Sequence, residues 1–225
     1  MHRLLPLVLI LACSTPKPVE AGTPTQKPAA AADEGTKAAP PPGPGQAVAI
    51  FGMGCFWCGE SDMEAQPGVI EVLSGYAGGP EPHPTYEQVS SHGTGHAESV
   101  YVIYDPTKTT YDKLLDGFWH GIDPFQQEGQ FCDHGHQYRS VIFPLDDTQR
   151  AAAEASKAKI EAQLGKPVAT TIENPGTFWE AEDYHQDFYK KNPDHYQAYR
   201  NGCGRDATTE KIWGDQSNGH LHHAN

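Results

Sequence analysis

Basic residues are scarce in this chain of 225 residues, which has 16 Lys+Arg against 29 Asp+Glu and a formal net charge of -13. Nucleic-acid binders neutralise phosphates with clustered Lys and Arg, so the shortage argues against that class and against a basic membrane-surface module. The sequence also has no apolar run of about 18 residues, and it therefore predicts no conventional transmembrane helix. The chain is nevertheless 37% hydrophobic and 10% aromatic, which is enough for one globular core of ordinary size.

The first 45 residues differ in composition from the rest. Nine of the 19 prolines lie between Pro6 and Pro44, and residues 14–45 show no apolar periodicity. Such a segment buries too little surface to offset its ordering entropy, so residues 13–45 are predicted to form a disordered tether. Residues 46–225 hold 12 Lys+Arg and 26 Asp+Glu, so the acidity belongs to one domain.

The N-terminus is typical of a secretion signal. A basic start at Arg3 precedes an apolar run, and we predict a signal peptide over residues 1–12. The run ends in Ala12-Cys13-Ser14, which resembles a bacterial lipobox with Cys13 as the lipid attachment site. The alternative is an ordinary signal with a chance cysteine, but the long tether favours a lipoprotein because an anchored domain needs a spacer. We therefore expect a membrane-anchored lipoprotein on the extracytoplasmic, periplasmic side, where disulfides persist.

The domain alternates short apolar segments with helical ones. Strands are expected at residues 47–51, 69–76, 99–104, 138–143 and 168–172, and helices at residues 55–66, 110–120 and 146–164. This order predicts an α+β fold, a ferredoxin-like α/β sandwich with a mixed sheet. Beyond Asn174 we expect an irregular C-terminal extension that wraps the domain. Two long loops, residues 80–95 and 122–137, are expected to carry function, as loops above about 12 residues usually do.

Five cysteines occur, at positions 13, 55, 58, 132 and 203. Cys55 follows a strand and a Gly-x-Gly turn at the predicted start of a helix, where free N–H groups and the helix dipole favour a thiolate. We therefore predict that Cys55 is a nucleophile. The spacing Cys55-Phe56-Trp57-Cys58 is compatible with a structural disulfide, a thioredoxin-like redox pair, half a zinc site, or two buried thiols without a role.

A zinc site would need further ligands. Cys132, His134 and His136 could supply them, but the chain has no second Cys-x-x-Cys. We therefore expect no metal, and we expect Cys132 to be a small buried residue without a role.

The residues around Cys55 carry a resemblance to a known family. Gly54-Cys55-Phe56-Trp57 resembles the active-site signature of peptide methionine sulfoxide reductase A. Further blocks similar to that family follow in the family's order: SGYAGG at 74–79, PTY at 84–86, GTGHAE at 93–98, DHGHQYRS at 133–140, AEDYHQ at 181–186 and CGRD at 203–206. The resemblance covers about residues 46–214, and several blocks in order are highly specific. It identifies residues 46–225 as a methionine sulfoxide reductase domain.

The resemblance implies the reaction. Methionine-S-sulfoxide, free or peptide-bound, is reduced to methionine while Cys55 becomes a sulfenic acid and then a disulfide. A thioredoxin-type external dithiol then reduces the disulfide, so no metal, flavin or nicotinamide cofactor is implied.

The resemblance also implies roles for the site residues. Glu98 is the general acid, and Tyr86 and Tyr138 donate hydrogen bonds to the sulfoxide oxygen. Asp133 supports this hydrogen-bond network. The side chains of Phe56 and Trp57 form the apolar cage for the substrate's S-methyl group.

Two cysteines remain candidates for resolving the sulfenic acid. Cys58 lies on the same helix face as Cys55, and Cys203 lies between two glycines that would let its segment move. We favour Cys58 as the first resolver, with Cys203 relaying the disulfide outward or resolving alone.

The cysteines alone are also compatible with other functions. The chain could be a general thiol–disulfide oxidoreductase using Cys55 and Cys58, or a zinc-binding or disulfide-stapled module. Neither accounts for Glu98, Tyr86 and Tyr138 in the family's order.

Overall fold

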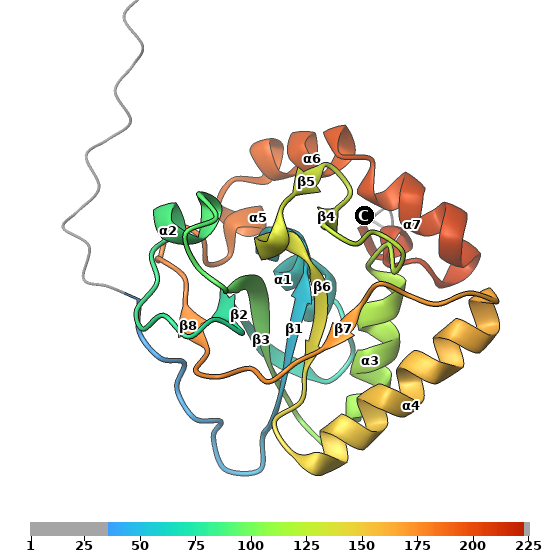
Figure 1. Ribbon diagram of the computed structural model, residues 1–225, viewed down its shortest axis with the longest axis horizontal. Helices are drawn as coiled ribbons and strands as arrows, with labels where there is room; N and C mark the ends of the chain where they lie inside the picture. Colours follow the sequence, from blue (N-terminus) through green and yellow to red (C-terminus); the bar gives the residue numbers. More distant parts are fainter. Residues whose placement is uncertain (1–35, 223–225) are drawn as a thin grey trace, which may run out of the picture. The chain divides into compact units, whose positions relative to one another are not determined.

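The computed structural model describes residues 36–222 (Figure 1). Its strands are β1 (Ala47–Met53), β2 (Val69–Ala77), β3 (Ala97–Tyr104), β4 (Gly129–Gln130), β5 (Asp133–His134), β6 (Ser140–Phe143), β7 (Thr171–Ile172) and β8 (Trp179–Glu180). Its helices are α1 (Phe56–Glu64), α2 (Tyr86–Ser90), α3 (Tyr111–His120), α4 (Asp147–Leu164), α5 (Phe188–Lys191), α6 (Pro193–Gly202) and α7 (Arg205–Trp213), with short 3-10 turns η1 (His136–Tyr138), η2 (Gly214–Gln216) and η3 (Asn218–His222). Cys13 and the predicted signal peptide lie outside the described residues. Within residues 36–222, no helix has the length and apolar character needed to cross a membrane.

Six strands form one mixed sheet in the order β7-β6-β1-β3-β2-β8. All neighbours are antiparallel except β6 and β7, which run parallel. The inner strands follow the order β6-β1-β3-β2, with α1 linking β1 to β2 and α3 linking β3 to β6. This is the split β-α-β arrangement of ferredoxin-like folds, so the predicted α+β fold with a mixed sheet is confirmed.

The core lies on both faces of the sheet because β1 alternates its side chains between them. Ala49, Phe51 and Met53 join the larger apolar cluster, in which Phe51 stacks on Phe118 of α3 at 5.2 Å between ring centroids. Val48 and Ile50 belong to the smaller cluster on the other face.

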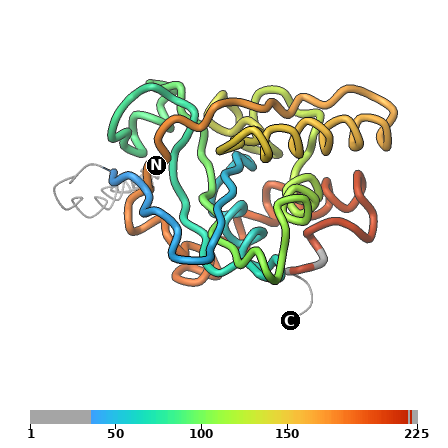
Figure 2. Tube along the Cα trace, turned by 90° about the horizontal axis from the view of Figure 1, so that it is seen from below, coloured from blue at the N-terminus to red at the C-terminus, as the bar shows by residue number. Residues whose placement is uncertain are grey.

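The N-terminal segment of the described chain, residues 36–46, is bound to the domain. Thr36 is buried and its hydroxyl donates to the Pro84 carbonyl at 2.9 Å, while Ala38 forms a β-bridge with Trp179. In Figure 2 this segment, blue, lies on the opposite side of the molecule from α4, gold. The domain therefore includes at least ten residues that the composition assigned to the tether. The sequence did not predict this contact because a Pro- and Ala-rich segment shows no apolar periodicity. The contact is made by the extended backbone, which forms hydrogen bonds with the edge of β8.

Two helix starts agree with the sequence signals. Thr110 accepts a hydrogen bond from the Lys113 N–H at 3.3 Å, and Asp146 accepts one from the Gln149 N–H at 2.8 Å. The helix α4 ends at Gly165, whose φ of 70° is in the left-handed region.

The region beyond Asn174 is more regular than expected. It contains β8 and the helices α5, α6 and α7, and α6 starts with Pro193 at its first position, a helix-start signal that the sequence reading did not use. In Figure 1, α6 lies next to the short strands β4 and β5, which fall within the predicted loop of residues 122–137. The chain segments expected to be irregular therefore build one end of the domain together.

Two buried arginines attach this C-terminal region to α1 and to the ends of β1 and α3. Arg200 binds Asp62 at 2.9 Å and Asp206 at 2.7 Å. The Arg205 side chain donates to the carbonyls of Met53 and Gly121 at 3.0 and 2.9 Å. Because buried charges are costly without partners, these contacts place α6 and α7 firmly against the helix that carries Cys58.

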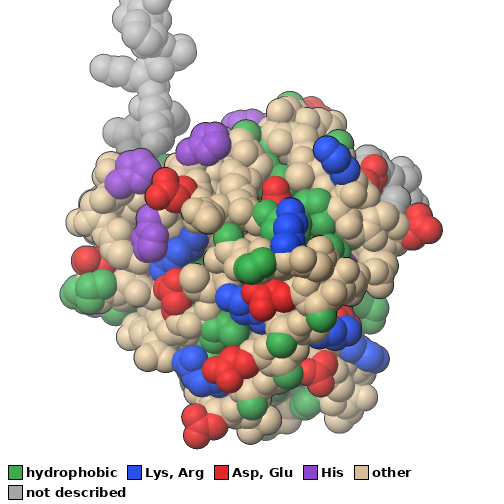
Figure 3. All heavy atoms as spheres, turned by 45° about the vertical axis from the view of Figure 1, so that its right-hand side comes forward, with side chains coloured by type: hydrophobic (Ala, Val, Ile, Leu, Met, Phe, Trp, Pro, Cys, Tyr) green, Lys and Arg blue, Asp and Glu red, His purple; other side chains and the backbone are tan. Residues whose placement is uncertain are grey.

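Basic side chains do not gather on the face drawn in Figure 3. Lys and Arg lie dispersed among Asp and Glu there, and histidines collect near one end. That face therefore carries mixed charge rather than a continuous basic stripe.

Candidate active site

A cavity of about 80 Å³ lies at the N-terminus of α1. Its walls are formed by Cys55, Phe56, Trp57, Tyr86, Glu98, Asp133, Tyr138 and Tyr199. They come from the β1–α1 turn, α1, α2, β3, β5, η1 and α6. All of these residues except Tyr199 are ones that the sequence predicts to act as nucleophile, acid, hydroxyl donors, supporting carboxyl or cage. A larger hollow of about 390 Å³ between α3 and residues 215–218 contains none of the cysteines.

The turn between β1 and α1 delivers Cys55 to this cavity. Gly54 has a φ of 81°, and a Cβ there would meet Gln130 Cβ at 2.5 Å, so glycine allows both the turn and the close approach. Cys55 is the N-cap of α1, and its carbonyl accepts hydrogen bonds from the N–H groups of Cys58 and Gly59 at 3.1 and 3.2 Å. The Cys55 residue is 6% exposed.

The thiols of Cys55 and Cys58 affect each other's pKa. Burial raises the pKa of Cys55 well above its usual value, and the hydrogen bond that its thiol donates to Cys58 raises it further. The same hydrogen bond lowers the pKa of Cys58 to about 7, and Arg205 and Arg200 lower it as well against the effect of burial. The helix N-terminus was expected to favour a thiolate at Cys55, and burial of this thiol acts in the opposite direction by raising its pKa.

Glu98 lies inside β3 rather than before it, and its side chain is buried. Its carboxyl oxygen accepts a hydrogen bond from the Phe56 N–H at 3.1 Å. Burial raises the pKa of Glu98 to about 8, the Phe56 N–H opposes this shift, and Asp133 adds to it. At neutral pH the group therefore retains its proton, as a general acid must.

The two tyrosines of the cavity keep their protons. Burial and the nearby Glu98 carboxyl raise the pKa of Tyr86 to about 12, and the same two causes raise the pKa of Tyr138 further. Both hydroxyls are therefore hydrogen-bond donors over the whole physiological range.

Asp133 of β5 and Tyr199 of α6 form one wall of the cavity. The Tyr199 hydroxyl donates to the Asp133 carboxyl. Burial raises the pKa of Asp133, whereas the Tyr199 hydrogen bond and the Arg205 charge lower it. Tyr199 lies on α6, and the sequence analysis missed it because it treated that region as irregular.

The apolar wall is built from aromatic rings. Trp57 stacks on Phe188 with 3.7 Å between ring centroids and an interplanar angle of 7°. Tyr199 lies edge-on to Trp57, with 5.8 Å between ring centroids. Phe56 is fully buried beside Tyr76, at 5.8 Å between centroids. Such a wall suits an apolar, polarisable group attached to sulfur.

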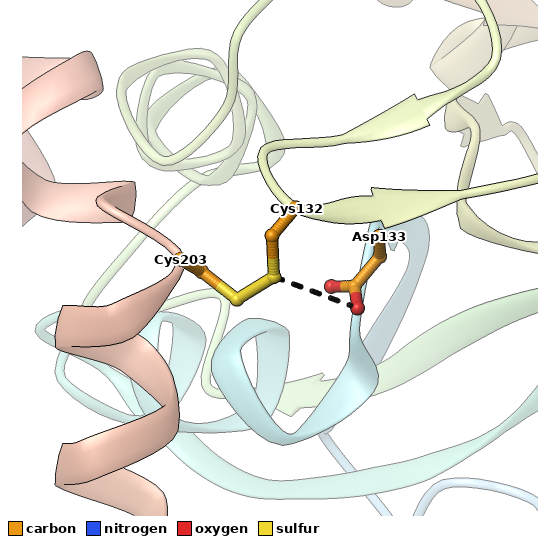
Figure 4. A group of neighbouring side chains, drawn as sticks. All are labelled: Cys132, Asp133 and Cys203. Carbon is orange, nitrogen blue, oxygen red and sulfur yellow. Dashed lines mark hydrogen bonds between the residues drawn. A yellow bond between two sulfur atoms is a disulfide. The ribbon is translucent and has the colours of Figure 1, made fainter.

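A disulfide joins Cys132 to Cys203 (Figure 4), with 4.9 Å between Cα atoms and a sequence separation of 71. The expectation that Cys132 is buried and without a role is wrong, since it is exposed and bonded. Cys spacing alone does not reveal such a partner, because the contact depends on α6 packing against the β4–β5 hairpin. Cys55 and Cys58 are free thiols.

The described residues contain two groups of potential metal ligands. One is Cys132, Asp133 and Cys203, whose sulfurs are bonded to each other. The other consists of the carboxyls of Glu60, Glu64 and Asp187, of which Glu64 and Asp187 bind the ammonium group of Lys190 at 2.6 and 2.8 Å. The zinc alternative required His134 and His136, and neither belongs to these groups.

A buried thiol at a helix start, a protonated carboxyl and two tyrosine hydroxyls around one cavity define a thiol-dependent oxidoreductase. The model of the family described as "Peptide methionine sulfoxide reductase" matches residues 47–217. The chain belongs to this family, and it reduces methionine sulfoxide.

Relatives and solved structures agree with this family. The chain is 50% identical over 169 residues to peptide methionine sulfoxide reductase MsrA 2 of Rhizobium meliloti, covering 75% of this chain and 84% of the relative. It is 48% identical to MsrA of Bacillus subtilis, covering 74% and 96%. Among solved structures, reduced Mxr1 of Saccharomyces cerevisiae has a TM-score of 0.64 at 30% identity, covering 68% of this chain and 90% of that one. Methionine sulfoxide reductase A of Corynebacterium diphtheriae has a TM-score of 0.60 at 30% identity, covering 72% and 90%.

Proposed function

We propose that Cys55 attacks the sulfur of methionine-S-sulfoxide, free or peptide-bound, while Glu98 protonates the departing oxygen. The observation that supports this most strongly is that the Cys55 thiol and the proton-bearing Glu98 share one small cavity with an aromatic wall. Tyr86 and Tyr138 donate hydrogen bonds to the oxygen, and Phe56 and Trp57 enclose the methyl group.

The reaction begins with a proton transfer within the cysteine pair. Cys58 accepts the Cys55 proton through the hydrogen bond between them, and the Cys55 thiolate bonds to the sulfoxide sulfur while Glu98 protonates the sulfoxide oxygen. The S–O bond breaks and the hydroxyl oxygen bonds to the Cys55 sulfur. The S–S bond breaks in the same step, its electron pair stays with the methionine sulfur, and methionine leaves. The resulting sulfenic acid condenses with the Cys58 thiol to give a disulfide and one water.

The choice of epimer tests this assignment. With dithiothreitol as reductant, the intact chain is expected to reduce methionine-S-sulfoxide and leave the R epimer unchanged. The reason is that a pocket with a fixed site for the oxygen and a fixed site for the methyl group accepts only one configuration at the sulfur. Chromatography of the two epimers measures this. Equal turnover of both epimers would contradict the proposed placement of the oxygen and the methyl group.

For recycling, we propose that a thioredoxin-type dithiol first reduces Cys132–Cys203, and that the freed thiols then reduce Cys55–Cys58. Each step is a thiol–disulfide exchange that conserves electrons. Burial supports this order, since Cys55 and Cys58 are 6% and 1% exposed whereas Cys132 is exposed. An external protein therefore reaches the outer pair more readily than the inner one.

Replacing Cys58 identifies the resolving residue. Cys58→Ser is expected to release about one methionine per enzyme, more slowly than the wild type because the proton acceptor is lost, and then to stop under thioredoxin. Cys203→Ser is expected to form the Cys55–Cys58 disulfide, which peptide mass spectrometry after one turnover detects. Normal recycling in Cys58→Ser, together with its loss in Cys203→Ser, would reverse the assignment.

We further propose that the mature chain begins at an acylated Cys13 and is anchored on the extracytoplasmic side of a membrane. Acyl chains contribute roughly 0.8 kcal/mol per buried CH₂, so multiple chains give stable attachment. The wild type is expected in the membrane fraction and Cys13→Ala outside it, with Cys203→Ser as the matched control that stays with the membrane. A soluble mature protein that starts at another residue would overturn the anchor.

A further inference from the structure

Glu182 contacts the two sides of the cavity without lining it. One carboxyl oxygen accepts the Tyr86 N–H at 2.8 Å, and the other accepts the Tyr76 hydroxyl at 2.9 Å. The second oxygen also lies 4.0 Å from Nε2 of His185. The Glu182 side chain is 17% exposed, so these contacts are partly shielded from water.

His185 connects Glu182 to the apolar wall. The Trp57 indole N–H donates to Nδ1 of His185 at 3.0 Å. Since Nδ1 accepts, the proton of the neutral imidazole is on Nε2, the nitrogen that faces Glu182. The imidazole is buried and packs against the rings of Phe56 and Tyr86 at 4.9 and 4.6 Å between centroids.

We propose that Glu182 is a positioning residue that couples the two halves of the substrate site. Through His185 it fixes the plane of the Trp57 indole, and through the Tyr86 backbone it places the Tyr86 hydroxyl. It thereby sets the enzyme's preference for a methyl group on the sulfoxide sulfur. This inference rests on the proposed roles of Trp57 and Tyr86.

The chemistry of the three contacts requires a carboxyl group with two acceptor oxygens. A glutamine keeps one acceptor for the Tyr86 N–H but presents an NH₂ group toward Tyr76 and His185. Two N–H groups then face each other across the 4.0 Å between Glu182 and Nε2 of His185, which favours a turned ring or the other tautomer. Either response removes the acceptor from the Trp57 N–H.

Glu182→Gln is tested with methionine-S-sulfoxide and ethionine-S-sulfoxide, which differ by one CH₂ on the sulfur. We expect kcat/KM for the methyl substrate to fall by about 10- to 100-fold, as for a displacement near 1 Å. We expect kcat/KM for the ethyl substrate to fall much less. The methyl preference is the ratio of the two kcat/KM values, and one methylene is worth about 10- to 200-fold in such a ratio. We expect this ratio to fall by about tenfold in Glu182→Gln. The matched control is Asp183→Asn at the next, exposed position, which should change neither value.

A double-mutant cycle separates positioning from general damage. Trp57→Phe removes the indole N–H, so adding Glu182→Gln to it should lower the methyl preference no further. An equal loss for both substrates in Glu182→Gln overturns the positioning role while the proposed reaction stands. An unchanged methyl preference in Trp57→Phe overturns both the cage and the positioning role. Should Glu182→Gln not fold, His185→Leu is measured instead, and an unchanged methyl preference there also overturns the proposal.

Discussion

Cys55→Ser is expected to abolish the reduction of methionine sulfoxide. The serine hydroxyl is not ionised at neutral pH and its oxygen is not a soft nucleophile, so it does not attack the sulfoxide sulfur. The free thiol of Cys58 does not replace it, because the cavity is lined by Cys55 and not by Cys58. The measurement is methionine formed with dithiothreitol in excess.

Two controls accompany this variant. Cys132→Ser removes a cysteine of the outer pair and is expected to keep activity with dithiothreitol, which reduces the inner disulfide directly. A thermal melt of Cys55→Ser is expected to match that of the wild type, because serine replaces sulfur by a smaller atom at one buried position. Substantial turnover in a folded Cys55→Ser protein would contradict the nucleophile assignment.

Glu98→Gln is expected to lower the rate of methionine formation by about 10²–10⁴-fold, the usual contribution of general acid catalysis. The glutamine side chain retains the shape of the glutamate but has no acidic proton for the sulfoxide oxygen. The measurement is the single-turnover rate, which excludes the recycling steps.

The pH dependence gives this prediction a second readout. Burial raises the pKa of Glu98 to about 8, so the reactive protonated form is present below that pH and is lost as the pH rises through it. The single-turnover rate of the wild type should therefore fall as the pH rises through about 8, and this fall should be absent in Glu98→Gln. The exposed Glu87 of α2 offers the matched control, Glu87→Gln. If Glu98→Gln were as active as the wild type, the proton donor would have to be sought at Tyr86 or Tyr138.

The sequence determined the features that depend on neighbouring residues. Short apolar, alternating or β-branched runs predicted the inner strands. The side chains of Thr110 and Asp146 predicted two helix starts because capping acts over three residues. The resemblance of the motif blocks to a known family predicted which residues surround Cys55. The boundaries were less accurate: Glu98 proved to lie within β3.

The tertiary structure decided whatever depends on burial or on distant contacts. Pairing of Cys132 with Cys203 needs α6 beside the β4–β5 hairpin, and the binding of residues 36–46 needs the exposed edge of β8. Burial in the folded core raises the pKa of Cys55, an effect opposite in direction to that of the helix dipole. Local patterns carry neither the dielectric environment of a side chain nor the identity of its distant partners, and these two quantities set the chemistry of this site.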